Sequence, residues 1–408
     1  MRAPLWVLGG LACALTPPIL LGFGVPPGIA LAASLVVLAI ALRGGSVNAL
    51  VLIGSCGVAL GLYGAALRVS GLDDAIYYRF HERFATWNAR DGHRSYLPGV
   101  RFHEREPYGD LQILTSEAIA EPRDVTFRTD SDGFRNDADY AGEPWVLVGD
   151  SFVVGVANSQ QDILQARLAQ RGVRAYNLGH PGGPLDYESY WRSFQRRRSG
   201  AARPLLFLFE GNDFPETVGA REPPHWWAVL DRHVRGATAP FTRLATYRVT
   251  RSLFARVAAR GDLRNGREVL VLPLAGTRQA FFTREVVGAR APELQDMALT
   301  DAALARLAPD LAAVFFIPTK YRVYQPWVAP GEALPDASWR HLERLCDEYA
   351  VRCFDLTPAL VRRSEALLAS GRFTWWRDDT HWNGEGIDAA AARVVEVLST
   401  LDADPGHR

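Results

Sequence analysis

The amino-terminal part of the chain carries almost no charge, and this constrains its fold more than any other feature. Residues 3–42 and residues 44–67 contain no charged side chain, and only Arg43 separates the two stretches. Uncharged apolar stretches of this length are typical of membrane spans, whereas a cleaved signal peptide has one short apolar core. Turn-forming residues at 24–28 would let the first stretch fold back. We therefore expect residues 1–67 to form a membrane anchor of three transmembrane helices, at about residues 3–23, 28–42 and 47–67.

The few charges beside these stretches predict an orientation. With three spans, Arg2 and Arg43 lie on the same side of the membrane, and the positive-inside tendency assigns that side to the cytoplasm. The rest of the chain then lies outside the cytoplasm. An anchor of two spans would reverse this placement, and the sequence leaves the choice between two and three spans open.

Composition excludes some classes of function. The 45 Lys and Arg residues equal the 45 Asp and Glu residues, so no net positive field attracts nucleic acid, and we expect no nucleic-acid partner. Cys346 and Cys353 stand close together outside the apolar stretches, and either a disulfide or two buried thiols fits them. No second pair of cysteines or histidines accompanies them, so we expect neither a metal nor a cofactor.

Five short apolar runs alternate with helical patterns in the second part of the chain. Such alternation predicts βα units, and runs without a polar face are typical of strands covered on both sides. We expect an α/β fold with a parallel sheet of about five strands and helices on both faces. In this interpretation residues 68–143 connect the anchor to a domain of residues 144–401, which carries an insertion at 214–310 and is followed by a tail at 402–408. The runs are residues 145–148, 173–178, 205–209, 312–317 and 351–356.

Polar residues and glycines follow four of these runs. Ser151 comes after the first run, behind Gly149 and Asp150. The carboxyl end of a parallel strand can expose a nucleophile, which also needs a base and donors for the oxyanion. By itself a Gly-Asp-Ser sequence is a weak signal for catalysis, because it also fits a helix N-cap after a strand, and the N-cap is then the preferred interpretation. The catalytic interpretation gains from three later blocks in chain order, which are residues 177–183, 210–213 and 377–383.

The four blocks resemble those of the SGNH (GDSL-type) hydrolase superfamily, and the resemblance covers about residues 145–401. It implies a flavodoxin-like sheet and an acyl-enzyme formed on Ser151, with His381 as the base. It also implies an oxyanion hole made by the backbone N–H groups of Ser151 and Gly182 and by the side chain of Asn212.

Some positions leave alternatives within this resemblance. Gly182 is preferred to Gly179 because it follows the asparagine of its block at the superfamily's spacing. Gly211 directly precedes Asn212, whereas the superfamily usually has one residue between them. Most members place the acid three residues before the histidine, which selects Asp378. Members similar to alginate O-acetyltransferases read Asp-Thr-His-Trp, which selects Asp379, and we prefer Asp379 with Asp378 as the alternative.

Three further side chains are candidates for substrate contact. Lys320 follows the fourth run, and Trp376 and Trp382 flank the histidine. Aromatic rings near a site often stack on sugars, and core packing is the alternative interpretation. Residues 128–136 also look like a segment found in membrane-tethered bacterial members of the superfamily, although an Asp-Gly turn explains them as well.

The sequence therefore predicts a serine-dependent carbohydrate esterase or O-acetyltransferase, anchored in the inner membrane with its catalytic domain outside the cytoplasm, in the periplasm. Its expected partners are an acylated polysaccharide of the cell surface or medium and the lipid bilayer, with a membrane protein that donates acyl groups as a further candidate. Two alternatives stay open, namely a lipase or thioesterase near the membrane and a non-catalytic accessory protein of polysaccharide modification or export.

Overall fold

The structure is a computed structural model that describes residues 62, 63, 66, 80–88, 91–115, 117–198, 202–214, 268–291 and 297–403. The expected anchor at residues 1–67 lies almost entirely outside the described residues, and so does much of the expected insertion. None of the helices described here combines the length and the apolar character needed to cross a membrane.

The chain divides into two compact units. One consists of Met1–Gly92 and Pro223–Leu263, and its described elements are η1 (Phe80–Phe84) and β1 (Ala85–Asn88). The other, the second unit, consists of His93–Glu222 and Arg264–Arg408 and contains the central sheet. Residues 93–143, which the sequence suggested as a connecting segment, fold in the same unit as the sheet.

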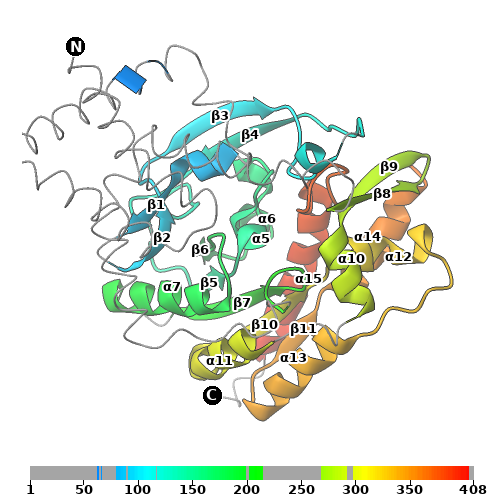
Figure 1. The fold of residues 1–408 in the computed structure, drawn as a ribbon. Helices are drawn as coiled ribbons and strands as arrows, with labels where there is room; N and C mark the ends of the chain where they lie inside the picture. Colours follow the sequence, from blue (N-terminus) through cyan, green and yellow to red (C-terminus); the bar gives the residue numbers. More distant parts are fainter. Residues whose placement is uncertain are drawn as a thin grey trace, which may run out of the picture. The chain divides into compact units, whose positions relative to one another are not determined.

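A five-stranded parallel sheet lies at the centre of this unit (Figure 1). The strands form at the five apolar runs, so the predicted α/β fold with a parallel sheet is confirmed. From one edge to the other the order is β11 (Cys353–Asp355), β10 (Ala313–Ile317), β7 (Arg203–Phe209), β5 (Trp145–Val148) and β6 (Ala175–Asn177).

Helices cover both faces of the sheet because strand side chains alternate between two apolar clusters. In β5, Trp145 and Leu147 belong to one cluster, and Val146 and Val148 to the other. The first face is covered by α6 (Leu164–Ala169), α10 (Thr283–Arg290), α12 (Lys320–Val328), α14 (Thr357–Leu368) and α15 (Gly384–Ala403). The second is covered by α7 (Pro184–Arg197), α11 (Ala298–Leu307) and α13 (Ala337–Glu348).

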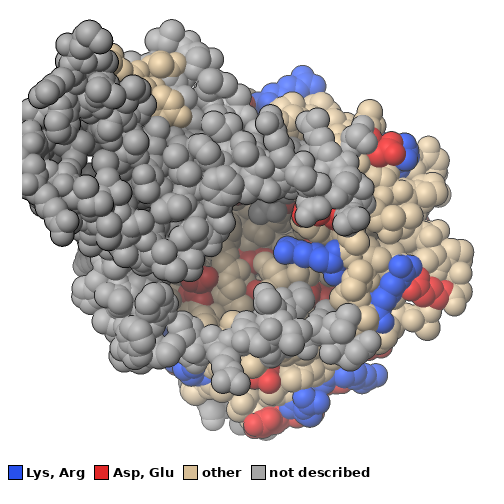
Figure 2. Space-filling model, viewed as in Figure 1, with Lys and Arg blue, Asp and Glu red and all other residues tan. Residues whose placement is uncertain are grey.

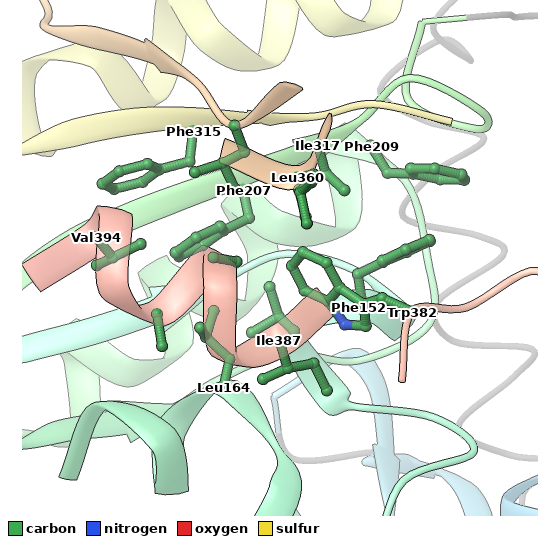
Figure 3. Close-up of a cluster of buried hydrophobic side chains, with 14 of the residues drawn as sticks. Phe152, Leu164, Phe207, Phe209, Phe315, Ile317, Leu360, Trp382, Ile387 and Val394 are labelled. Carbon is green, nitrogen blue, oxygen red and sulfur yellow. The ribbon is translucent and has the colours of Figure 1, made fainter. Parts of the chain in front are cut away.

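The first cluster joins the sheet to α15 and to the start of α5 (Ser151–Val154) (Figure 3). Phe207 and Phe315 stack on neighbouring strands with ring centroids 4.9 Å apart. Ile387 of α15 is fully buried in the same cluster. Burial of one such side chain contributes roughly 1.5–3 kcal/mol, so α15 is held firmly on the sheet. Trp382 belongs to the same cluster and precedes α15. It therefore ties the loop at residues 376–383 (the histidine loop) to the core.

Within the second unit, two antiparallel pairs of strands lie outside the central sheet. Strands β8 (Val269–Leu274) and β9 (Thr277–Phe282) form a hairpin whose two turn residues, Ala275 and Gly276, have φ of 47° and 74°, as tight hairpin turns require. The pair of β3 (Arg101–Glu106) and β4 (Arg123–Arg128) belongs to the segment before the sheet. The remaining elements are β2 (His93–Tyr96), η2 (Gln112–Leu114), η3 (Gln160–Asp162) and η5 (Ala308–Asp310).

A disulfide joins Cys346 of α13 to Cys353 of β11. The sequence left a disulfide and two thiols open at this point. The bond ties the edge strand of the sheet to a helix that covers its second face.

Candidate active site

Ser151 lies at the turn from β5 into α5. The turn needs Gly149, because a Cβ atom there would lie 2.6 Å from Cγ2 of Val153 and 2.9 Å from the carbonyl oxygen of Phe207. Asp150 caps α5 by accepting a hydrogen bond of 2.8 Å from the backbone N–H of Phe152. Ser151 is consequently the first residue of the helix, and its N–H belongs to the amino end that lacks partners within the helix.

A chain of hydrogen bonds connects Ser151, His381 and Asp379. The Oγ atom of Ser151 lies 2.8 Å from Nε2 of His381, and Nδ1 of His381 lies 2.7 Å from Oδ1 of Asp379. All three residues are buried, with Ser151 the most accessible at 8% exposure. This is the order of nucleophile, base and orienting acid that serine-dependent acyl transfer requires.

Asp379 is held in its ionised form. Burial by itself raises the pKa of a carboxyl group, but the hydrogen bonds and charge of His381 and the charge of Arg123 outweigh it and lower the pKa of Asp379 below its ordinary value. The backbone N–H of His381 also donates to Asp379 Oδ1, at 2.9 Å. An ionised acid at this position favours the His381 tautomer that carries its proton on Nδ1, which leaves Nε2 free to accept the proton of Ser151.

Asp378 points away from the histidine. Its Oδ2 atom accepts hydrogen bonds from the backbone N–H groups of Gly109, at 2.7 Å, and Glu121, at 2.9 Å. Its Oδ1 atom forms an ion pair of 2.6 Å with Arg123. Of the two aspartates left open by the sequence, the structure thus brings Asp379 to the ring of His381 and Asp378 to the segment before the sheet.

Asn212 lies at the carboxyl end of β7 and is linked to the turn that carries Ser151. Its side-chain NH₂ group donates to Oδ2 of Asp150 at 2.9 Å, and the NH₂ group has a second hydrogen that this bond does not use. The neighbouring Asp213 is buried and accepts hydrogen bonds of 2.7 Å from Tyr187 and from the backbone N–H of Phe209. Asp213 therefore fixes the turn that presents Asn212.

Gly182 and Gly179 differ in their surroundings. Gly179 packs against α5, where a Cβ atom would lie 2.8 Å from Cγ1 of Val153, and its N–H donates to Oδ1 of Asn177. Gly182 lies in the loop before α7, and its N–H has no acceptor among the described residues. A free N–H is what an oxyanion donor needs, whereas Gly179 is required for close packing.

The three expected substrate contacts are placed differently. Trp382 is completely buried in the first apolar cluster, which favours core packing over the stacking of a sugar on its ring. Lys320 is also buried, and its amine donates to the carbonyl oxygens of Trp376 and Arg377 at 2.7 and 3.1 Å. Burial lowers the pKa of Lys320 to about 8. It supports the histidine loop rather than offering its charge to a ligand.

Trp376 is half-buried, and the guanidinium group of Arg123 lies over its ring at 4.4 Å from the centroid. One face of the Trp376 ring is thus covered by Arg123. In the described part of the surface shown in Figure 2, acidic side chains (red) lie close to basic ones (blue).

Several residues of this site lie before the sheet and were missed from the sequence. The backbone N–H of Asp110 donates to Oδ2 of Asp379 at 3.1 Å, and its carboxylate accepts from the backbone N–H of Thr380 at 2.8 Å. Arg123 pairs with both aspartates. No spacing or motif links these positions to residues 378–381 in the chain, so only their fold brings them together.

Two carboxylates and a histidine lie close enough together to be candidate metal ligands. Ligand atoms of Asp110, Asp379 and His381 lie within 4.8 Å of one another. The Asp379 and His381 atoms are paired with each other, and Asp110 is bonded to Thr380. The atoms that could bind a metal are thus already engaged in hydrogen bonds, which hold Asp379 and His381 beside Ser151.

Comparisons with family models, with curated proteins and with solved structures find no match for this chain. The residues of the site and their geometry are therefore the basis on which a family and a function can be proposed.

Proposed function

We propose that this protein is a serine-dependent esterase or O-acetyltransferase of the SGNH type that acts on an acylated carbohydrate. The observation that carries the proposal is the hydrogen-bonded chain from Ser151 through His381 to Asp379, at 2.8 and 2.7 Å. A serine hydroxyl at the end of a strand, with a base and an ionised acid in this order, is the arrangement that activates a nucleophile.

The residues perform the reaction in two steps. His381 takes the proton of Ser151 while Oγ attacks the ester carbonyl carbon, and the alcohol then leaves with that proton, so that an acyl-enzyme forms. In the second step His381 takes a proton from water or from a sugar hydroxyl, which attacks the acyl carbon, and Ser151 regains its proton. The N–H groups of Ser151 and Gly182 and the NH₂ group of Asn212 stabilise the oxyanion in both steps.

The strand order supports the SGNH assignment. Counted in chain order among the strands of the central sheet, it reads second, first, third, fourth, fifth from β6 to β11, which is the order of flavodoxin-like sheets. In such sheets ligands bind where the strand order reverses, here between β5 and β7. Ser151 follows β5 and Asn212 follows β7, on the two sides of this point. The residues between β7 and β10 form an insertion in this fold.

The proposed setting is the inner membrane, with the catalytic domain outside the cytoplasm and a polysaccharide as substrate. The uncharged amino-terminal stretches and the resemblance to alginate-modifying members support this setting. The disulfide between Cys346 and Cys353 also supports it, since disulfides persist in oxidising compartments. The acyl group for a transfer reaction would come from a membrane protein.

The test uses the purified full chain and a chromogenic acetyl ester. We expect hydrolysis by the wild type, and loss of hydrolysis to background in Ser151→Ala and His381→Ala. Ser370→Ala, which changes an exposed serine, serves as the matched control and should retain wild-type activity. Equal activity in the wild type, Ser151→Ala and His381→Ala would contradict the proposal. Addition of a polysaccharide acceptor then separates transfer, which yields O-acetylated sugar, from hydrolysis, which yields free acetate.

A further inference from the structure

Arg123 is a buried cation in a part of the chain that the proposed reaction does not use. It begins β4, and its side chain is only 2% exposed. A guanidinium group in such surroundings is stable only when carboxylates and hydrogen bonds compensate for the loss of water. The partners of Arg123 therefore indicate why the protein retains it.

The first partner of Arg123 is Asp378, at 2.6 Å. The same carboxylate accepts hydrogen bonds from the backbone N–H groups of Gly109 and Glu121. The backbone carbonyl oxygen of Asp378 accepts a further hydrogen bond of 3.0 Å from the N–H of Leu111. All of these contacts connect the segment before the sheet to one residue of the histidine loop. Asp378 is thus the anchor by which that segment holds the loop.

The second partner is Asp379, whose two oxygen atoms face different groups. Oδ1 faces His381, whereas Oδ2 faces the N–H of Asp110 at 3.1 Å and Nη1 of Arg123 at 3.7 Å. Nη1 has no hydrogen-bond partner among the described residues, so its contribution to Asp379 is that of a nearby charge. Asp110 and Arg123 thus hold the carboxylate at Oδ2, while Oδ1 orients the imidazole of His381.

The close approach of the two segments depends on Gly109. A Cβ atom at this position would lie 2.5 Å from the carbonyl oxygen of Asp378, 2.6 Å from Cβ of Asp379 and 2.7 Å from Nη2 of Arg123. The ring of Trp376, 4.4 Å from the guanidinium carbon, limits Arg123 on another side. The guanidinium group is therefore held in place by close packing as well as by its ion pairs.

We propose that Arg123 is a positioning residue of the candidate active site, which holds Asp379 against His381 with Asp378 as its anchor. This inference rests on the proposed function, because it assigns Arg123 to the orientation of the base in that reaction. Arg123 touches no reacting atom, so its loss misplaces the acid and the imidazole without removing a substrate contact. Misplacement of a catalytic group is expressed in kcat, whereas loss of a ground-state contact is expressed in KM.

The experiment compares Arg123→Met with Arg128→Met in the full chain. Arg128 lies on the same strand, is exposed and pairs with Asp137 on the surface, so it is a matched control. We expect kcat for the chromogenic acetyl ester to fall on the order of 10²-fold in Arg123→Met at nearly unchanged KM, and both constants to stay at wild-type values in Arg128→Met. Arg123→Lys should regain only part of the loss, because lysine keeps the charge but lacks the planar fork of arginine.

A second readout does not depend on activity. The proton shared by Nδ1 of His381 and Asp379 should give a low-field proton resonance in the wild type that is absent from His381→Ala. We expect this resonance to be lost or shifted in Arg123→Met and kept in Arg128→Met. If Arg123→Met does not fold, the folded Arg123→Lys variant provides the same comparison.

The outcomes separate the two proposals. An active wild-type enzyme with unchanged kcat and an unchanged resonance in Arg123→Met or Arg123→Lys overturns the role of Arg123 and leaves the proposed function standing. Equal losses in Arg123→Met and Arg128→Met also overturn it. A wild type without Ser151-dependent ester cleavage counts against the proposed function, and the resonance then still decides whether Arg123 positions Asp379.

Discussion

Asp378 and Asp379 are neighbours in the chain, yet their carboxylates belong to different parts of the unit. Asp379 reaches His381, and Asp378 reaches Arg123 and two backbone N–H groups. Burial raises the pKa of Asp378, while the contacts with His381 and Arg123 lower that of Asp379 despite its burial. The different surroundings assign the two residues different tasks, one as an anchor and one as the orienting acid.

This difference leads to a prediction at the residue scale. Asp379→Asn should lower kcat on the order of 10³- to 10⁴-fold, because an amide no longer holds His381 in the tautomer that accepts a proton from Ser151. Asp378→Asn should mainly lower the free energy of unfolding, because the buried Arg123 then loses the carboxylate closest to it. Steady-state kinetics and urea unfolding of both full-chain variants test this. A loss of kcat confined to Asp378→Asn, with Asp379→Asn fully active, would reverse the assignment.

The sequence could narrow the acid to two residues but could not choose between them. Adjacent residues share the same local pattern, and the choice depends on how the backbone turns at 376–381. The turn is fixed by contacts that are distant in the chain, such as those of Lys320 with the carbonyl oxygens of Trp376 and Arg377. For the same reason the sequence suggests Lys320 as a substrate contact, whereas in the structure its amine is engaged in these hydrogen bonds.

At the scale of elements, the strands were predicted well and the segment before them poorly. Strand β5 coincides with its apolar run, and the other four strands of the central sheet lie on theirs to within a few residues at each end. Local composition is enough to predict these strands, because a strand covered on both faces is apolar throughout. Strands β3 and β4 have charged residues on many positions, and their role appears only through long-range contacts.

Arg135 shows how this segment supports the nucleophile's helix. Its guanidinium group is fully buried and donates hydrogen bonds to the carbonyl oxygens of Val154, Gly155 and Asn158, just after Ser151. It also donates to the carbonyl oxygen of Thr126 in β4. A cation at the carboxyl end of a helix is favourable, and here it also donates to buried carbonyl groups, which need hydrogen-bond partners.

A prediction at the element scale follows from these contacts. Arg135→Met should lower the free energy of unfolding by about 3 kcal/mol or more, since the carbonyl groups of Thr126, Val154 and Asn158 lose their donor and each unsatisfied group costs about 1–3 kcal/mol. Arg105→Met removes an exposed arginine of β3 and should change stability by less than about 0.5 kcal/mol. Urea unfolding of the full chain in detergent gives both values. Similar stability of the two variants would contradict the role assigned to Arg135.

At the scale of the whole unit, charges are buried on several sides of the candidate site. Glu285 of α10 is 4% exposed, and its Oε1 atom has no hydrogen-bond partner among the described residues. The charged groups near it are Arg284, Asp110, Glu210 and Lys320. Burial raises the pKa of Glu285 to about 8, with Arg284 as the main opposing influence. No periodic pattern in the sequence indicates that this glutamate is buried, because its burial depends on the packing of the hairpin β8–β9 and α10 onto the sheet.

The raised pKa makes the stability of the protein depend on pH. Between the ordinary pKa of 4.5 and about 8, folded Glu285 keeps a proton that the unfolded chain releases, so the folded state binds more protons and the free energy of unfolding decreases as pH rises. The stabilising contribution is complete below about pH 4.5 and is lost as pH passes about 8. Glu106 behaves in the same sense, with burial raising its pKa to about 8.

We therefore expect the wild type to be less stable at pH 8.5 than at pH 5, and Glu285→Gln to lose less stability over that interval, because glutamine is neutral at both values. Glu365→Gln changes an exposed glutamate and controls for the removal of a carboxyl group, so it should show the same loss as the wild type. Urea unfolding of the full chain at the two pH values measures each loss. Other buried acids also contribute to the change in the free energy of unfolding with pH, but all three proteins contain them, so their contributions cancel in the comparison. Equal losses in the wild type and Glu285→Gln would mean that Glu285 is already ionised in the folded protein, and that Lys320 and Arg284 compensate for its burial.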